Sequence, residues 1–208
     1  MSDKWSVAKK GEDVNWNYTQ ASYNKPNKRR NKVTLKVSVY IATSLDGFIA
    51  RKNGDIDWLT GGEGGENYGY AEFMSGIDHI VMGRNTYEKV LTFGGWPYAK
   101  KVTVLSSRNL TIPPNLSDKV EALNLSPREL INEMDTRSAK HIYLDGGVTI
   151  QRFLREGLVD KMTITTIPIL IGEGLPLFGK LDGDVKLELI RSESFKNGFV
   201  QNKYRTLR

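Results

Sequence analysis

The 208-residue chain has no cysteine and only two histidines, His79 and His141. The lack of cysteine excludes disulfide bonds, thiolate nucleophiles and cysteine-based zinc sites. Two isolated histidines also make a histidine-rich metal site unexpected. The sequence therefore predicts no metal centre.

Long apolar runs are also missing. No stretch is long enough to cross a bilayer as a helix, and the polar N-terminus does not contain the apolar core of a secretory signal. These absences predict a cytoplasmic protein that has no membrane partner. The length suits one folded domain with an added tail.

Positive charge is concentrated in residues 1–32, which hold eight basic and three acidic side chains and so carry +5 of the net charge of +6. Their low aliphatic content predicts a disordered extension before a folded domain at 33–208. Four aromatic residues lie among the basic ones, which would suit single-stranded nucleic acid: Trp5, Trp16, Tyr18 and Tyr23. A solvated extension is the preferred interpretation, so nucleic acid is not the expected partner.

Residues 141–154 have the pattern of a buried strand, a glycine turn and a helix with an apolar face. Gly146 and Gly147 let the backbone adopt positive φ and let a ligand approach closely. The free N–H groups at the helix start are suited to a pyrophosphate. A tight turn without a ligand explains this stretch equally well.

Similar junctions recur along the chain. Residues 78–83 predict a strand that leads into a helix at 84–91, and residues 101–106 predict another strand. Alternating strands and helices predict a three-layer α/β fold, with a mostly parallel central sheet and helices on both faces. An Asn-Gly turn predicts a C-terminal antiparallel hairpin. Four groups are expected at the carboxyl edge of this sheet, where ligands bind: Asp46, Gly83-Arg84, Ser106 and Gly146-Gly147.

Three segments resemble the dihydrofolate-reductase-like superfamily: residues 44–50, 81–87 and 143–147. Within it, the chain is most similar to the C-terminal reductase domain of the bifunctional riboflavin-biosynthesis deaminase/reductase and its stand-alone bacterial relatives. The resemblance covers about 33–208. It implies a dihydrofolate-reductase-like fold and an NADPH-dependent reductase of a pteridine-like or pyrimidine-like heterocycle, often dimeric. The nearest nameable activity is 5-amino-6-(5-phosphoribosylamino)uracil reduction in riboflavin biosynthesis.

By position, the resemblance implies three groups of cofactor-binding residues. Those expected at the cofactor phosphates are Gly83, Arg84, Asn85 and Thr86; those near the adenosine 2′-phosphate are Ser106, Ser107 and Arg108; and those at the pyrophosphate are Gly146, Gly147, Val148 and Thr149. Such a site fits the attraction of helix starts and arginine for anions.

The expected substrate side departs from both well-known relatives. Riboflavin-pathway reductases usually place a Lys or Arg after Ser-Leu-Asp-Gly to hold a substrate phosphate, where this chain has Phe48. Dihydrofolate reductases carry an acid four residues before the phenylalanine of their first helix, where this chain has Gly69. A nucleotide-binding protein of the same fold without turnover is therefore the competing hypothesis.

Asp46, Phe48 and Trp58 are the expected substrate-binding residues. A carboxylate beside apolar Phe48 and Trp58 would have a raised pKa, which makes Asp46 the candidate for proton handling. Asp46 is alternatively a turn residue that hydrogen-bonds the backbone. Trp58 is a candidate for stacking on a flat heterocycle, or alternatively part of the core.

Overall fold

The computed structural model describes residues 35–59 and 67–208. The prediction for the basic extension at 1–32 falls outside the described residues. Within the described part, no helix has the length and apolar character that crossing a bilayer requires.

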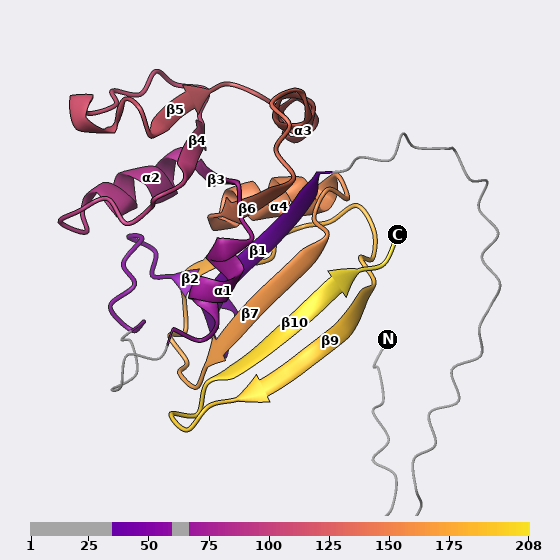
Figure 1. Cartoon of the computed structure of the whole chain (residues 1–208). Coiled ribbons are helices and arrows are strands. Elements are labelled where there is room, and N and C mark those ends of the chain that lie inside the picture. Colours follow the sequence, from indigo (N-terminus) through magenta and orange to yellow (C-terminus); the bar gives the residue numbers. More distant parts are fainter. Residues whose placement is uncertain (1–34, 60–66) are drawn as a thin grey trace, which may run out of the picture. The chain divides into compact units, whose positions relative to one another are not determined.

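An eight-stranded sheet lies at the centre of the described part (Figure 1), with the strand order β5-β4-β3-β6-β1-β7-β10-β9. Its strands are β1 (Lys36–Ser44), β3 (His79–Gly83), β4 (Lys101–Leu105), β5 (Val120–Leu123), β6 (His141–Asp145), β7 (Lys161–Ile167), β9 (Leu187–Ser194) and β10 (Val200–Thr206). The strands from β5 to β7 are parallel to one another. The hairpin of β9 and β10 joins β7 in antiparallel fashion, as predicted from its Asn-Gly turn.

The helices cover both faces of the sheet, which confirms the predicted three-layer fold. They are α1 (Tyr70–Ser75), α2 (Arg84–Leu91), α3 (Pro127–Thr136) and α4 (Gly147–Arg155). Alternate residues of a strand point to opposite faces. Val81 packs in one core cluster with α3 and α4, whereas its neighbours Ile80 and Met82 pack in a second cluster with α1 and α2. Both cores are therefore built on the same strands.

Two smaller elements complete the described part. A two-stranded ribbon pairs β2 (Phe48–Ala50) with β8 (Leu175–Pro176), and a short 3-10 helix, η1, covers Pro114–Leu116. The Gln151 side-chain amide donates hydrogen bonds to the carbonyl oxygens of Pro176 (3.0 Å) and Leu177 (3.3 Å). These bonds tie the ribbon to α4 and bring β2 close to the start of that helix.

Candidate functional site

The four predicted groups do share the carboxyl edge of the sheet. Gly83 ends β3, Ser106 follows β4, Gly146 follows β6, and Asp46 lies two residues beyond β1. These four strands are parallel, so their carboxyl ends meet at one edge. The prediction of a common edge is therefore confirmed.

The starts of α2 and α4 interlock through two glycine–threonine contacts. A Cβ atom on Gly83 would lie 2.7 Å from Oγ1 of Thr149, and one on Gly146 would lie 2.2 Å from Oγ1 of Thr86. Gly146 also has φ +89° and ψ 132°, a conformation that strongly favours glycine. The two junctions that were predicted separately thus form one unit, in which each glycine makes room for a threonine of the other helix.

Both helix starts leave their first N–H groups uncapped by side chains. The residues at the caps are Gly83 and Gly146, and neither helix has an acid in its first turn. α3 provides the contrast, because Ser126 and Glu129 form the capping box there. Uncapped donors at the positive end of two adjoining helices suit an anionic group. The residues present therefore fit the phosphates of a dinucleotide cofactor.

The side chains around these helix starts differ in whether they already have a charged partner and in how exposed they are. Arg84 donates to Oε1 of Glu88, one turn along α2, over 2.9 Å. Asn85 is exposed, and the Val148 side chain is 68% exposed. Both lie in the first turn of their helix. Arg84 therefore already has a carboxylate partner, whereas Asn85 and Val148 have room beside them.

The segment after β4 forms a local turn. The Ser106 hydroxyl donates to the carbonyl oxygen of Arg108 (2.7 Å) and accepts from its N–H group (3.1 Å). Ser107 and Arg108 are exposed. Because β4 lies beside β3, the turn lies one strand away from the start of α2. This position suits contact with an outer part of the same ligand.

A carboxyl group that was not assigned a role from the sequence lies directly before the start of α4, on a residue that pairs in register with Met82 of β3. Asp145 ends β6, accepts from the N–H group of Gly146 (2.8 Å) and receives a long hydrogen bond (3.4 Å) from the Tyr98 hydroxyl. Although the residue keeps some exposed surface, burial of its carboxyl group raises the pKa of Asp145. Burial and the charge of Asp145 also raise the pKa of Tyr70 to about 12.

Asp46 has a different environment from the one predicted. Its Oδ2 atom accepts from the N–H groups of Gly172 (2.8 Å) and Ile171 (3.1 Å). Hydrogen bonds, first from the Ser44 hydroxyl and then from these amides, lower the pKa of Asp46. The expectation of a raised pKa is therefore wrong, because the residue is exposed and its charged form is well solvated by donors. The catalytic role of Asp46 stays a prediction.

Phe48 and Trp58 lie in different surroundings. Phe48 is half-buried on β2, next to Ile49, which approaches Gly147 so closely that a Cβ atom there would lie 2.8 Å from Cδ1 of Ile49. Trp58 is buried against Ile167 and Phe199, in agreement with the core interpretation. The ribbon thus brings the Phe48 segment to the start of α4, whereas Trp58 contributes to packing.

No group of three or more histidine, cysteine, aspartate or glutamate side chains is arranged to hold a metal ion within 35–59 and 67–208. The groups described at the carboxyl edge are backbone donors, hydroxyl groups, arginines and two aspartates.

Comparison with known proteins places this geometry in a family. Residues 35–201 match the model of the RibD C-terminal domain. The chain is 35% identical over 164 residues to the uncharacterised protein YwjB of Bacillus subtilis (strain 168), covering 77% of this chain and 92% of that protein. The crystal structure of a putative riboflavin biosynthesis protein from Shewanella sp. PV-4 is 41% identical, with a TM-score of 0.80, and covers 84% of this chain and all of that one.

A more distant structure shares the fold. It is the diaminohydroxyphosphoribosylaminopyrimidine deaminase/5-amino-6-(5-phosphoribosylamino)uracil reductase of Thermotoga maritima, with a TM-score of 0.66 and 15% identity over 83% of this chain and 57% of that one. The match to the family model spans most of the described residues and includes both helix starts. The chain belongs to the RibD C-terminal domain family.

Proposed function

We propose that this protein is an NADPH-dependent reductase of a pyrimidine-like or pteridine-like heterocycle. The observation that carries the proposal is the pair of uncapped, interlocked helix starts beside a buried carboxyl group at the carboxyl edge. Membership of a family whose relatives include a uracil reductase domain supports the same reaction class. Reduced nicotinamide supplies hydride when it is bound.

In this proposal the two helix starts hold the cofactor phosphates. Backbone donors at the starts of α2 and α4 bind the pyrophosphate, and Arg84 adds a positive charge beside it. Arg108 reaches the 2′-phosphate from the turn after β4. The β2–β8 ribbon, which is anchored to α4 by Gln151, shields the same region from water.

Asp145 is the residue that we propose for proton handling. Reduction of a double bond adds hydride to one atom and a proton to the other, so a nearby side chain must deliver or orient that proton. The raised pKa of Asp145 favours its protonated form, which is the form that a proton donor needs. Asp46 has a lowered pKa and backbone partners, so it is the poorer donor.

Asn85→Asp and Val148→Asp should each weaken NADPH binding about tenfold or more, because a carboxylate would face the proposed phosphate position. Both residues are exposed in the first turn of a helix, where the helix dipole stabilises an acidic side chain. Their stability should therefore stay at or above that of the wild type. Calorimetric titration with NADPH measures the affinity, and thermal unfolding measures the stability.

Gly147→Asp would be a poorer test of the same site. Its Cβ atom would lie 2.8 Å from Cδ1 of Ile49 and 3.3 Å from the carbonyl oxygen of Pro176, so a loss of binding could reflect damage to the fold. Lys180→Gln provides a control with the same one-unit change in charge, because Lys180 is exposed and belongs to neither helix start. Unchanged NADPH affinity in both Asn85→Asp and Val148→Asp would contradict the proposed cofactor site.

Arg108→Gln should lower NADPH affinity about tenfold while leaving NADH affinity nearly unchanged. The guanidinium group is expected to contact the phosphate that distinguishes the two cofactors, and charge-assisted hydrogen bonds have this strength. Parallel titrations with NADPH and NADH measure the ratio. An equal loss for both cofactors would place Arg108 elsewhere on the ligand.

Turnover separates this proposal from the competing one, a nucleotide-binding protein without activity. The first screen should follow the loss of reduced-nicotinamide absorbance with aminouracils and pterins as substrates. Replacement of the usual phosphate-binding cation by Phe48 predicts that substrates lacking a phosphoribosyl group react better. Tight NADPH binding with no oxidation by any substrate would favour the competing function.

A further inference from the structure

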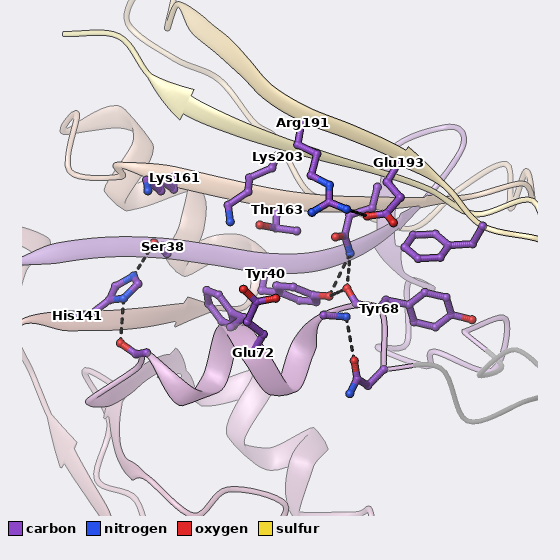
Figure 2. A pocket seen from close by; sticks show the side chains of 16 residues that line it. Ser38, Tyr40, Tyr68, Glu72, His141, Lys161, Thr163, Arg191, Glu193 and Lys203 are labelled. Atoms are coloured by element: carbon purple, nitrogen blue, oxygen red, sulfur yellow. Dashed lines mark hydrogen bonds and ion pairs between the residues drawn. The ribbon is translucent and has the colours of Figure 1, made fainter.

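A cavity of about 610 Å³ lies away from the carboxyl edge, between α1 and the sheet face formed by β1, β7, β10 and β9 (Figure 2). Basic side chains enter it from the sheet, whereas Glu72 faces it from α1. Its volume is within the usual range of small-molecule sites. The proposed reductase site uses none of the side chains that line it.

Positive charges lie directly opposite one another on the sheet side of this cavity. Lys203 of β10 pairs in register with Arg191 of β9, and both line the cavity. Two residues along β10, on the same face, Arg205 pairs in register with Lys161 of β7. Like charges directly opposite each other destabilise a sheet. Two such pairs lie side by side and form what we call the basic wall, of which Lys161, Arg191 and Lys203 line the cavity.

Acidic partners neutralise only two of these four cations. Arg191 forms an ion pair with Glu193 at 2.9 Å, and Arg205 pairs with Glu188. Lys161 and Lys203 form no ion pair with any described residue. Glu72, across the cavity, likewise has no ion-pair partner in the described part of the chain. The basic wall thus keeps two free ammonium groups.

A threonine hydroxyl without a partner lies on the same stretch of the sheet as these two lysines. Thr163 of β7 is opposite Lys203 in register and two residues from Lys161. It lines the cavity and is 6% exposed, and its hydroxyl has no hydrogen-bond partner among the described residues. Tyr40, adjacent in register on β1, presents a ring that packs 4.9 Å from the ring of Phe73. The wall therefore combines two ammonium groups, a free hydroxyl donor and an aromatic surface.

We propose that this cavity is a second binding site, which takes a small molecule with a phosphate or similar oxyanion group held by Lys161, Lys203 and the Thr163 hydroxyl. The organic part of the molecule lies against Tyr40 and Phe73. An anion relieves the repulsion on the basic wall and accepts a hydrogen bond from the free hydroxyl.

Titration of the full chain with inorganic phosphate and with phenyl phosphate tests the site. Lys203→Gln and Lys161→Gln should each raise the Kd for both probes about tenfold. Glu72→Gln should lower the Kd severalfold, because it removes an opposing charge from the cavity. Phenyl phosphate should bind severalfold more tightly than inorganic phosphate, since its ring reaches the aromatic surface.

A measurement of stability distinguishes the loss of an anion contact from damage to the fold. If the repulsion is real, Lys203→Gln should unfold at a temperature about 1–2 °C higher than the wild type in the absence of phosphate. A variant that binds less and is more stable cannot have lost affinity through damage to the fold. Lys180→Gln, outside the cavity, should change neither property.

Two outcomes would overturn the proposal. Phosphate affinity that responds to Asn85→Asp but not to either lysine variant would place the anion at the carboxyl edge, and so would support the reductase site while removing this one. A dimer, seen by sedimentation, that Lys203→Gln dissociates or tightens without any change in anion affinity would make the face a subunit contact. Loss of NADPH binding at the carboxyl edge, in contrast, would leave this second site unaffected.

Discussion

Replacing Asp145 by asparagine is expected to lower the turnover of the proposed reductase reaction by about 100-fold or more, which is the usual contribution of a positioned proton donor. Asparagine keeps the shape of the side chain and can still accept from the N–H group of Gly146. It cannot release a proton at the pH of the assay. NADPH affinity should change little, because the phosphate contacts assigned to the helix starts are intact.

The same substitution should stabilise the folded protein at neutral pH. Burial raises the pKa of Asp145 in the folded state. A raised pKa means that the folded state binds the proton more tightly, so the stability from this group is present below its unfolded pKa and lost as the pH rises through the folded value. Asparagine does not ionise, so Asp145→Asn does not lose this stability as the pH rises. Its advantage over the wild type should therefore grow as the pH rises from about 4.

Asp46→Asn is the matched control, and its effect on stability should have the opposite sign. Hydrogen bonds lower the pKa of Asp46, so its contribution is present above its unfolded pKa and lost as the pH falls through the folded value. Asp46→Asn should therefore be less stable than the wild type at neutral pH and equal to it in acid. Chemical unfolding over a pH series, with turnover measured in parallel, distinguishes the two aspartates. Full turnover by Asp145→Asn would exclude it as the proton donor.

Most of the fold was predictable because the signals that define its helices and strands lie within short stretches of sequence. Alternating apolar residues mark β7 at Lys161–Ile167, and the Gly83–Arg84 junction marks the start of α2. Ser126 and Pro127 mark the start of α3, where Ser126 forms the helix cap. These elements depend on periodicity and capping within a few residues. The short β2 and β8 strands were missed, because a two-residue pairing across more than a hundred positions leaves no periodic pattern.

The candidate site was only partly predictable for the opposite reason. The carboxyl-edge groups follow from strand order, so they were found. The roles of Asp46 and Asp145 depend on what surrounds each carboxyl group: backbone amides of residues 171 and 172 for one, and Tyr98 for the other. The basic wall is equally non-local, because Lys161 and Lys203 become neighbours only through the pairing of β7 with β10. Sequence spacing contains none of these contacts.

Gly146→Ala is expected to destabilise the protein by about 3 to 5 kcal/mol, the largest effect on stability predicted for this site. Two costs add at this position. A φ of +89° is strained for any residue with a Cβ atom, and the new Cβ would lie 2.2 Å from Oγ1 of Thr86. Denaturant unfolding measures the change in the free energy of unfolding.

A double-mutant cycle separates the two costs, because only the steric one depends on Thr86. In the Thr86→Ala background, Gly146→Ala should cost about 1 to 3 kcal/mol less than in the wild type. Gly157→Ala is the control for conformation alone, since Gly157 has φ +65° and no atom within 4 Å of the added Cβ. It should cost about 1 to 3 kcal/mol in either background.

The cycle also tests whether the interlocked helix starts form one functional unit. If Gly146 is needed only for packing, the double variant should regain NADPH affinity as it regains stability. If its backbone conformation aims the N–H groups of α4 at the pyrophosphate, affinity should remain low although the clash is gone. The proposed site requires the second result, because its donors are backbone groups whose direction is set at Gly146. Recovery of full affinity in the double variant would leave α2 as the main phosphate-binding element.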